Sequence, residues 1–217
     1  GDHRDLHSYP TRRSSDLNAG AKKVKVCDNS CFGARDAYPW SGIEDAVKAA
    51  GGDIVYLDNV TPKEMDLQGE RLAVWPVFQE IVESDLVINV PVLKQHMLSK
   101  LSCCFKNYMG AVGGPRHLWH RDLPSCLVDM AAFMKPRLTV VDAVRSIIKH
   151  GPEGAGPKDV KLMGIVAAGT DPVALEAFGA EQIGLDPAEG RAMKLAQARG
   201  LGQIDYHALP LADVFLE

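Results

Sequence analysis

The sequence lacks the features that would place it quickly in a well-known class. Its five cysteines form no C-x-x-C pair, which argues against a zinc ribbon or a ferredoxin-type cluster. No apolar run reaches the roughly 18 residues that a membrane-spanning helix needs. The formal net charge of -4 gives no support for non-specific nucleic-acid binding. We therefore expect neither a membrane span nor a nucleic-acid partner.

Three common α/β site motifs are also missing. There is no G-x-S-x-G nucleophile turn and no G-x-G-x-x-G dinucleotide loop, and the glycine-rich segment 151–159 lacks the GK[ST] of a P-loop. A chain of 217 residues can bury a core without disulfides, so an odd number of cysteines indicates reduced thiols and a cytoplasmic location. No motif in the sequence indicates a particular cofactor, and we assign no metal ligands from it.

The first 17 residues differ from the rest of the chain. They show no helical or strand periodicity and offer almost nothing to bury. The run TRRSSDL at 11–17 is the translation of a common sequencing-adapter string, so residues 1–17 are expected to be a non-native, disordered tail. The remainder, 18–217, is expected to form a single α/β domain.

From residue 22 onward, short apolar runs alternate with helical patterns. Strands are expected at 22–27, 53–58, 70–75, 85–91, 137–144 and 161–169. Helices are expected at 41–50, 76–84, 98–109, 123–134, 172–183 and 187–199, with a Ser41–Glu44 capping box and Asp171 as an N-cap. This alternation predicts an α/β fold with a mostly parallel sheet, helices on both faces and three layers.

Polar side chains follow the expected strands, where open α/β sheets bind their ligands. Because parallel strands end at one edge, these residues are expected to share it: Asp28, Asn29, Asp58, Asn59, Lys94, Gln95, His96, Asp142, Arg145, Thr170 and Asp171. The alternative for Asp58 and Asn59 is that they are ordinary loop and cap residues.

The segment 91–120 is strongly basic and contains several glycines. It has no acidic residue, and its positive field suits a carboxylate or phosphate ligand. Lys106 and Asn107 stand beside Phe105 and Tyr108, so we expect them to be partly buried. The alternative is a solvated basic face.

The run VINVPVLKQHMLSKLSCCFKNYMGAVGG at 87–114 resembles the signature of the domain of unknown function 362 family. The resemblance continues through RLTVVDAV and AAGTDPVALEAFGAEQIGLDP. It implies that the recurring polar positions of the family fall on Lys94, His96, Lys106, Asn107, Gly110, Asp142, Asp171 and Pro172. Members usually begin with a further strand–helix unit, so the resemblance also implies an amino-terminally truncated fragment. The family is often associated with iron–sulfur modules.

These observations favour a protein that binds or transforms a small anionic metabolite. His96, Lys106 and Asp142 are the candidate catalytic residues, with His96 as acid or base. The candidate ligand-binding residues are Lys94, Asn107, Gly110 and Asp171. One alternative is a non-catalytic accessory protein that docks a ferredoxin-like iron–sulfur partner. A metallocofactor carrier that uses His96, His117 and His120 is another.

Overall fold

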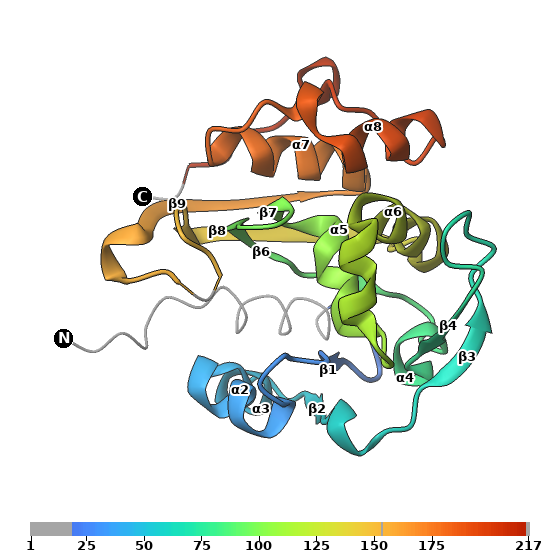
Figure 1. The fold of residues 1–217 in the computed structure, drawn as a ribbon. Coiled ribbons are helices and arrows are strands. Elements are labelled where there is room, and N and C mark those ends of the chain that lie inside the picture. Colours follow the sequence, from blue (N-terminus) through green and yellow to red (C-terminus); the bar gives the residue numbers. More distant parts are fainter. Residues whose placement is uncertain (1–18, 153, 216–217) are drawn as a thin grey trace. The chain divides into compact units, whose positions relative to one another are not determined.

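The structure is a computed structural model that describes residues 19–152 and 154–215 (Figure 1). The expected tail at 1–17 lies outside the described residues. The chain divides into two compact units. The first comprises residues up to 67, 73–85 and 109–118, and the second comprises 68–72, 86–108 and 119–217. The expectation of a single domain over 18–217 stays a prediction.

The first unit begins with a parallel strand pair, β1 (Lys25–Cys27) and β2 (Asp53–Val55). Between them lie two short helices, α2 (Ala34–Ser41) and α3 (Ile43–Ala49). Gly42 separates the helices with φ 74°, a left-handed conformation that glycine adopts without steric cost. The expected Ser41–Glu44 capping box is therefore wrong, because Ser41 closes α2 and Gly42 precedes α3.

The first unit also contains an antiparallel pair, β3 (Lys63–Asp66) and β4 (Val74–Val77), followed by α4 (Gln79–Val82). Sequence analysis missed β3, whose residues are mostly polar. Pro76 lies inside β4 and does not start the helix expected at 76–84. Val77 forms an isolated bridge with Val112, which draws residues 109–118 into this unit.

The second unit is built on one larger mixed sheet. Its strands are β5 (Ile88–Asn89), β6 (Val92–His96), β7 (Lys100–Ser102), β8 (Leu138–Ile147) and β9 (Val160–Gly169). β5 and β6 pair with β8 in parallel, whereas β7 pairs with β6 and β9 pairs with β8 in antiparallel fashion. The predicted α/β class is confirmed, with parallel and mixed sheets.

Four helices accompany this sheet: α5 (Cys104–Asn107), α6 (Leu123–Met134), α7 (Pro172–Gln182) and α8 (Arg191–Ala198). α7 lies against β8 and β9, and α8 packs on α6 and α7 (Figure 1). The bounds of α6 match the prediction, but the helix expected at 98–109 is replaced by β7 and the short α5. The 3-10 helices are Leu57–Asn59, Tyr108–Ala111, Arg116–Arg121, Pro157–Asp159, Pro187–Glu189 and Tyr206–Ala208.

β9 is an edge strand with an irregularity near its middle. Among the described strands it pairs with β8 alone. The register shifts by one extra residue on β9, where Gly164 has φ 69°, as in a glycine β-bulge. Leu162 and Val166 on this strand are both largely exposed.

Within the described ranges, no helix combines the length and the apolar character that crossing a membrane requires.

Candidate functional site

Lys94 and His96 lie within strand β6, and not in a loop after the strand expected at 85–91. β6 begins at Val92, directly after Pro91, and turns back into β7, with Lys94 opposite Ser102 and His96 opposite Lys100. Side chains alternate along a strand, so Lys94 and His96 share one face. Leu93 projects to the other face, which α7 covers through Gly179. The two predicted site residues therefore lie together on the face opposite to α7.

The imidazole of His96 is buried and held in one tautomer. Its Nδ1 accepts hydrogen bonds from the backbone N–H groups of Leu98 at 3.1 Å and Ser99 at 3.2 Å. Nδ1 therefore carries no proton, and in the neutral ring the proton is on Nε2. Burial, and after it the nearby charges of Lys106, His120 and Lys94, together lower the pKa of His96 to about 4. At neutral pH His96 is an N–H donor surrounded by positive charge.

Lys106 and Asn107 lie on α5, where Asn107 makes a structural contact. Its Nδ2 donates to Oδ1 of Asn89 at 2.8 Å, and the Asn89 amide donates to the carbonyl of Cys104 at 2.9 Å. Asn89 is buried, so this chain of hydrogen bonds anchors α5 to β5. Asn107 thereby fixes the helix that carries Lys106, whose charge acts on His96.

Asp142 lies in the middle of β8 and pairs in register with Val92 of β6. The pairing of β6 with β8 is irregular between Val92 and Lys94, and Lys94 pairs with Ile147, so Asp142 lies beside the start of β6 and not opposite Lys94. Its Oδ1 accepts from the backbone N–H of Val144 at 2.9 Å, beside the position where β9 bulges. The structure thus places Asp142 on the strand beside β6 and gives its carboxylate a structural bond, whereas its part in the candidate site stays a prediction.

Asp171 lies at the opposite end of the sheet, so the expectation that it shares the edge with His96 is wrong. β9 is antiparallel to β8, which places its carboxyl end, Gly169, beside Thr139 at the start of β8. His96 lies just beyond Lys94, which pairs with Ile147 of β8. Ile147 is roughly 25 Å from Thr139 along that strand. The carboxylate of Asp171 caps α7, as the sequence predicted, by accepting at Oδ1 from the Val173 and Ala174 N–H groups, and its Oδ2 accepts from the Gln203 N–H.

Gly110 belongs to the first unit, and its role there is close packing. A Cβ at this position would lie 1.7 Å from Oδ1 of Asp28. The carbonyl of Gly110 accepts from the backbone N–H of Asn29 at 2.8 Å. Asp28 and Asn29 follow β1, so Gly110 allows residues 109–112 to pack against the loop after that strand. Within this unit Asp58 caps α2 by accepting from Ala34 and Arg35 N–H groups, which supports its interpretation as a cap residue.

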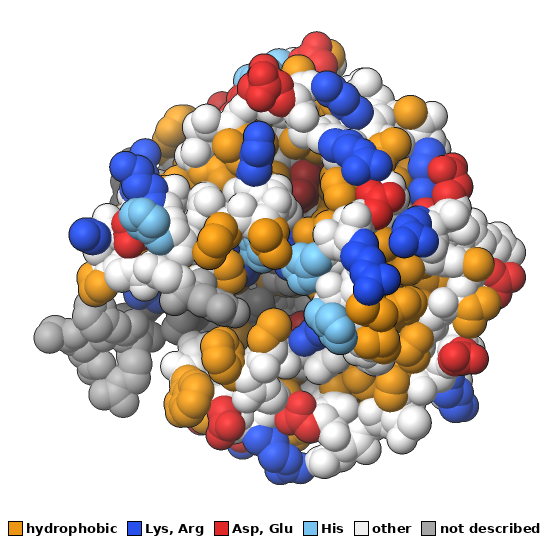
Figure 2. Space-filling model, viewed as in Figure 1, with side chains coloured by type: hydrophobic (Ala, Val, Ile, Leu, Met, Phe, Trp, Pro, Cys, Tyr) orange, Lys and Arg blue, Asp and Glu red, His pale blue; other side chains and the backbone are white. Residues whose placement is uncertain are grey.

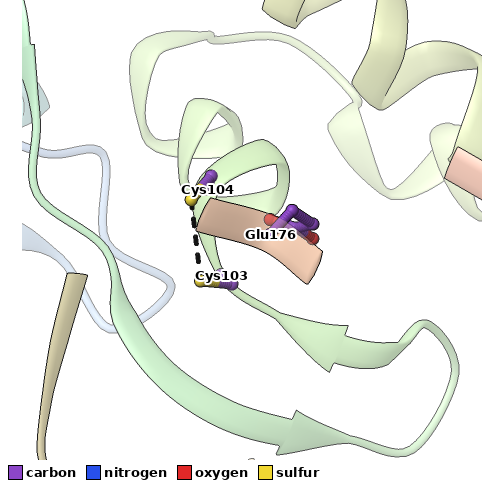
Figure 3. A group of neighbouring side chains, drawn as sticks. All are labelled: Cys103, Cys104 and Glu176. Carbon is purple, nitrogen blue, oxygen red and sulfur yellow. Dashed lines mark hydrogen bonds between the residues drawn. The ribbon is translucent and has the colours of Figure 1, made fainter. Parts of the chain in front are cut away.

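The metal-carrier alternative named three histidines, which differ from the potential metal ligands that lie together in the structure. His117 belongs to the first unit, whereas His96 and His120 belong to the second. Among the described residues, the three potential metal ligands that lie together are Cys103, Cys104 and Glu176 (Figure 3). Burial raises the pKa of the Glu176 carboxyl to about 7, and N–H groups of Phe105 and Cys104 oppose that rise.

Sequence analysis did not single out Glu176. A signal was nevertheless present, because a lone carboxylate stands in the apolar run PVALEAFGA of α7. Glu176 is 5% exposed, and a fully buried acidic residue is rare without a partner.

The surface gives little further guidance. On the face that Figure 2 presents, basic and acidic side chains are interspersed with hydrophobic ones and form no extended field of one sign. This agrees with the modest net charge of -4.

Comparison with known proteins adds a family and one relative. The family described as Domain of unknown function (DUF362) matches residues 15–181. The thylakoid-associated protein sll1697 of Synechocystis sp. is 30% identical over 131 residues. That alignment covers 57% of this chain and 40% of the relative, so the chain spans less than half of the relative's length. No solved structure matches the chain.

Proposed function

We propose, from the premise that the chain belongs to the family described as Domain of unknown function (DUF362), that it binds a small carboxylate- or phosphate-bearing anion on β6 of the second unit. The observation that carries this proposal is the neutral, tautomer-locked imidazole of His96 within the field of Lys94, Lys106 and His120.

Three features of this arrangement suit an anion. The Nε2–H group of His96 is a hydrogen-bond donor that stays neutral above its pKa of about 4. Lys94 shares its strand face, and Lys106 lies close enough for its charge to act on the ring. A bound anion would offset the mutual repulsion of these cations and would gain charge-assisted hydrogen bonds.

His96 serves in this proposal as a binding residue and not as the acid or base first expected. A general base must accept a proton near neutral pH, but protonation of His96 would break its hydrogen bonds from Leu98 and Ser99. Any proton transfer at the site would fall to another group, such as Lys106 or Asp142. Whether the bound anion is transformed is a separate step that these contacts do not require.

Asp142 would orient or partly neutralise the lysines from the neighbouring strand. Asn107 would act through α5, since it anchors the helix that carries Lys106. A ferredoxin-like partner and a cytoplasmic location stay predictions. The printed name of the relative associates that protein, not this chain, with thylakoids.

The test is thermal unfolding of the purified chain with sulfate, phosphate or succinate, against sodium chloride at equal ionic strength. A ligand at a hundredfold excess over its dissociation constant stabilises the folded state by about 2.7 kcal/mol. We expect each of Lys94→Ala and Lys106→Ala to weaken anion affinity at least about tenfold, or ~1.4 kcal/mol.

The matched control is Lys194→Ala, an exposed lysine on α8 that should leave the shift unchanged. Equal shifts in the wild type and in the Lys94 and Lys106 variants would refute the proposal. The salts would then act by general exclusion from the protein surface.

A further inference from the structure

We propose that Cys103, Cys104 and Glu176 form a closed binding site for a thiophilic divalent cation, best matched by Zn²⁺. Each residue offers one ligand atom, and these atoms all lie within 4.8 Å of one another (Figure 3). All three residues are buried, at 1%, 0% and 5% exposure. The site is separate from the proposed anion site and involves none of its residues.

The two thiols already have the spacing that a tetrahedral metal requires. Cys103 ends the turn after β7, and Cys104 opens α5. Their Sγ atoms are 3.7 Å apart. Two ligands at the usual zinc–sulfur distance of roughly 2.3 Å and at a tetrahedral angle would be about 3.8 Å apart. Little movement would therefore be needed to bring both sulfurs onto one ion.

Glu176 brings a carboxylate to the same point from α7. Its Oε2 accepts from the backbone N–H of Phe105 at 3.1 Å, which fixes the side chain toward the start of α5. No ion pair in the described part of the chain involves Glu176, although buried carboxylates are ordinarily paired or bound to metals. A cation between the carboxylate and the thiols would supply the missing positive charge.

A second buried polar group lies beside these three residues. The hydroxyl of Tyr108, a residue only 3% exposed, makes no well-formed hydrogen bond among the described residues, although a weak one with the Asn89 side chain acts on its pKa. Cys104 and Glu176 both act on it electrostatically, so it lies near both. Metal-bound thiolates and carboxylates commonly accept hydrogen bonds from surrounding groups, and Tyr108 could donate one.

The donor set selects the class of ion. Two sulfurs disfavour Mg²⁺ and Ca²⁺, which prefer oxygen ligands, and favour Zn²⁺, which accepts sulfur and oxygen together. A carboxylate that uses both oxygens would complete four-coordination. On binding, the ion replaces the two thiol protons and any proton on the Glu176 carboxyl; these protons pass to solvent, and no electrons are transferred.

Such a site would hold two elements together. It would link the β7–α5 junction to α7. Because Lys106 lies on the same short helix as Cys104, two residues later, the ion would also restrict the backbone that carries Lys106. Closed sites without an open coordination position are characteristic of structural zinc. The expected consequence is a more rigid α5.

The experiment is metal titration of the reduced, chelator-treated chain, with Zn²⁺ measured by competition against a chromogenic chelator and Co²⁺ used as a spectroscopic probe. We expect one equivalent to bind, with the sulfur-to-cobalt charge-transfer absorption and visible bands of tetrahedral Co²⁺. Cys103→Ser and Cys104→Ser should each weaken Zn²⁺ binding at least about a hundredfold, and Glu176→Gln about tenfold. Glu176→Gln retains an oxygen that can accept from Phe105.

Cys126→Ser is the matched control, because Cys126 is also a buried free thiol of the second unit and lies outside the group. It should bind Zn²⁺ as the wild type does. If the variants fail to fold, the wild-type Co²⁺ spectrum alone decides. Absence of thiolate charge-transfer bands, or unchanged Zn²⁺ affinity in a folded Cys103→Ser, Cys104→Ser double variant, overturns the proposal.

Discussion

The guanidinium of Arg199 donates from Nη1 to the buried Oδ1 of Asp129 at 2.6 Å, which joins the end of α8 to α6. Asp129 is 1% exposed, and its carboxylate also accepts from the backbone N–H groups of residues 70–72. One carboxylate on α6 thus accepts hydrogen bonds from a loop and from a cation. Although burial raises its pKa, hydrogen bonds from Leu72, Arg199 and Arg71 hold that pKa below its usual value.

Asp129→Asn should destabilise the protein by about 2–4 kcal/mol at pH 7, because it leaves Arg199 without its charged partner and presents an amide to N–H donors. Since the folded-state pKa is lowered, the stabilisation by Asp129 is present above the unfolded-state pKa. It is lost as the pH falls through the folded-state pKa. Urea unfolding from pH 7 to pH 3 measures both effects.

The control is Glu70→Gln, since the side chain of Glu70 is 79% exposed and 4.0 Å from Nε of Arg199. Its effect should stay within about 0.5 kcal/mol, as for other exposed ion pairs. A gap between wild type and Asp129→Asn that persists undiminished at pH 3 would contradict the assigned role.

His96 should make the protein less stable as the pH falls from about 6.5 to about 4. Its folded-state pKa is lowered, so in this window the unfolded chain takes up a proton that the folded chain does not. The wild type should lose about 1–3 kcal/mol more than His96→Gln, which cannot titrate. Urea unfolding of both proteins at pH 7, 6 and 5 gives the difference.

The pKa of His96 with and without sulfate gives a second, independent test of this prediction. A bound anion would offset the charges of Lys106 and Lys94, so the pKa of His96 followed by NMR should rise toward its ordinary value. In Lys106→Ala the pKa should be higher without sulfate and should respond less to it. Parallel stability profiles for wild type and His96→Gln would count against the buried, neutral imidazole.

Gly110→Ala should destabilise the first unit by about 1–3 kcal/mol, because its Cβ would lie 1.7 Å from Asp28 Oδ1 and the Asp28 carboxylate would have to move. Thermal unfolding checks this. Gly169→Ala is the control, since its Cβ would meet Leu175 only at 3.6 Å, an ordinary contact. If Gly110→Ala is as stable as the wild type, the close packing at this position is not needed, and a ligand role for Gly110 becomes the better explanation.

Local signals in the sequence were sufficient for some elements. α6 has closely spaced apolar residues at helical intervals. α7 starts at Asp171–Pro172, where the Asp171 side chain bonds to N–H groups two and three residues later. The place of Asp171 relative to His96 could not be inferred in the same way. It depends on β9 running antiparallel to β8, a long-range pairing that no local pattern specifies.

Two further site features depended on tertiary contacts. The expected strand does end before Pro91, as β5, but a second strand, β6, begins at Val92 because β7 and β8 supply its hydrogen-bonding partners. Lys94 and His96 were therefore assigned correctly to one neighbourhood but wrongly to a loop. The proximity of Cys103 and Cys104 to Glu176 joins residues more than 70 positions apart, and only packing of α5 against α7 brings them together.

The open edge of β9 affects how the chain behaves in concentrated solution. Half of the backbone amides of an edge strand face outward, where a strand from another molecule could bind them and start a growing assembly. Leu162 is 67% exposed and would add apolar contact to such an assembly. Gly164 and the charged Lys161 oppose it, because a bulge twists the edge away from a flat partner and like charges would meet across the new pairing. The same glycine that perturbs the register of the sheet therefore also favours colloidal stability.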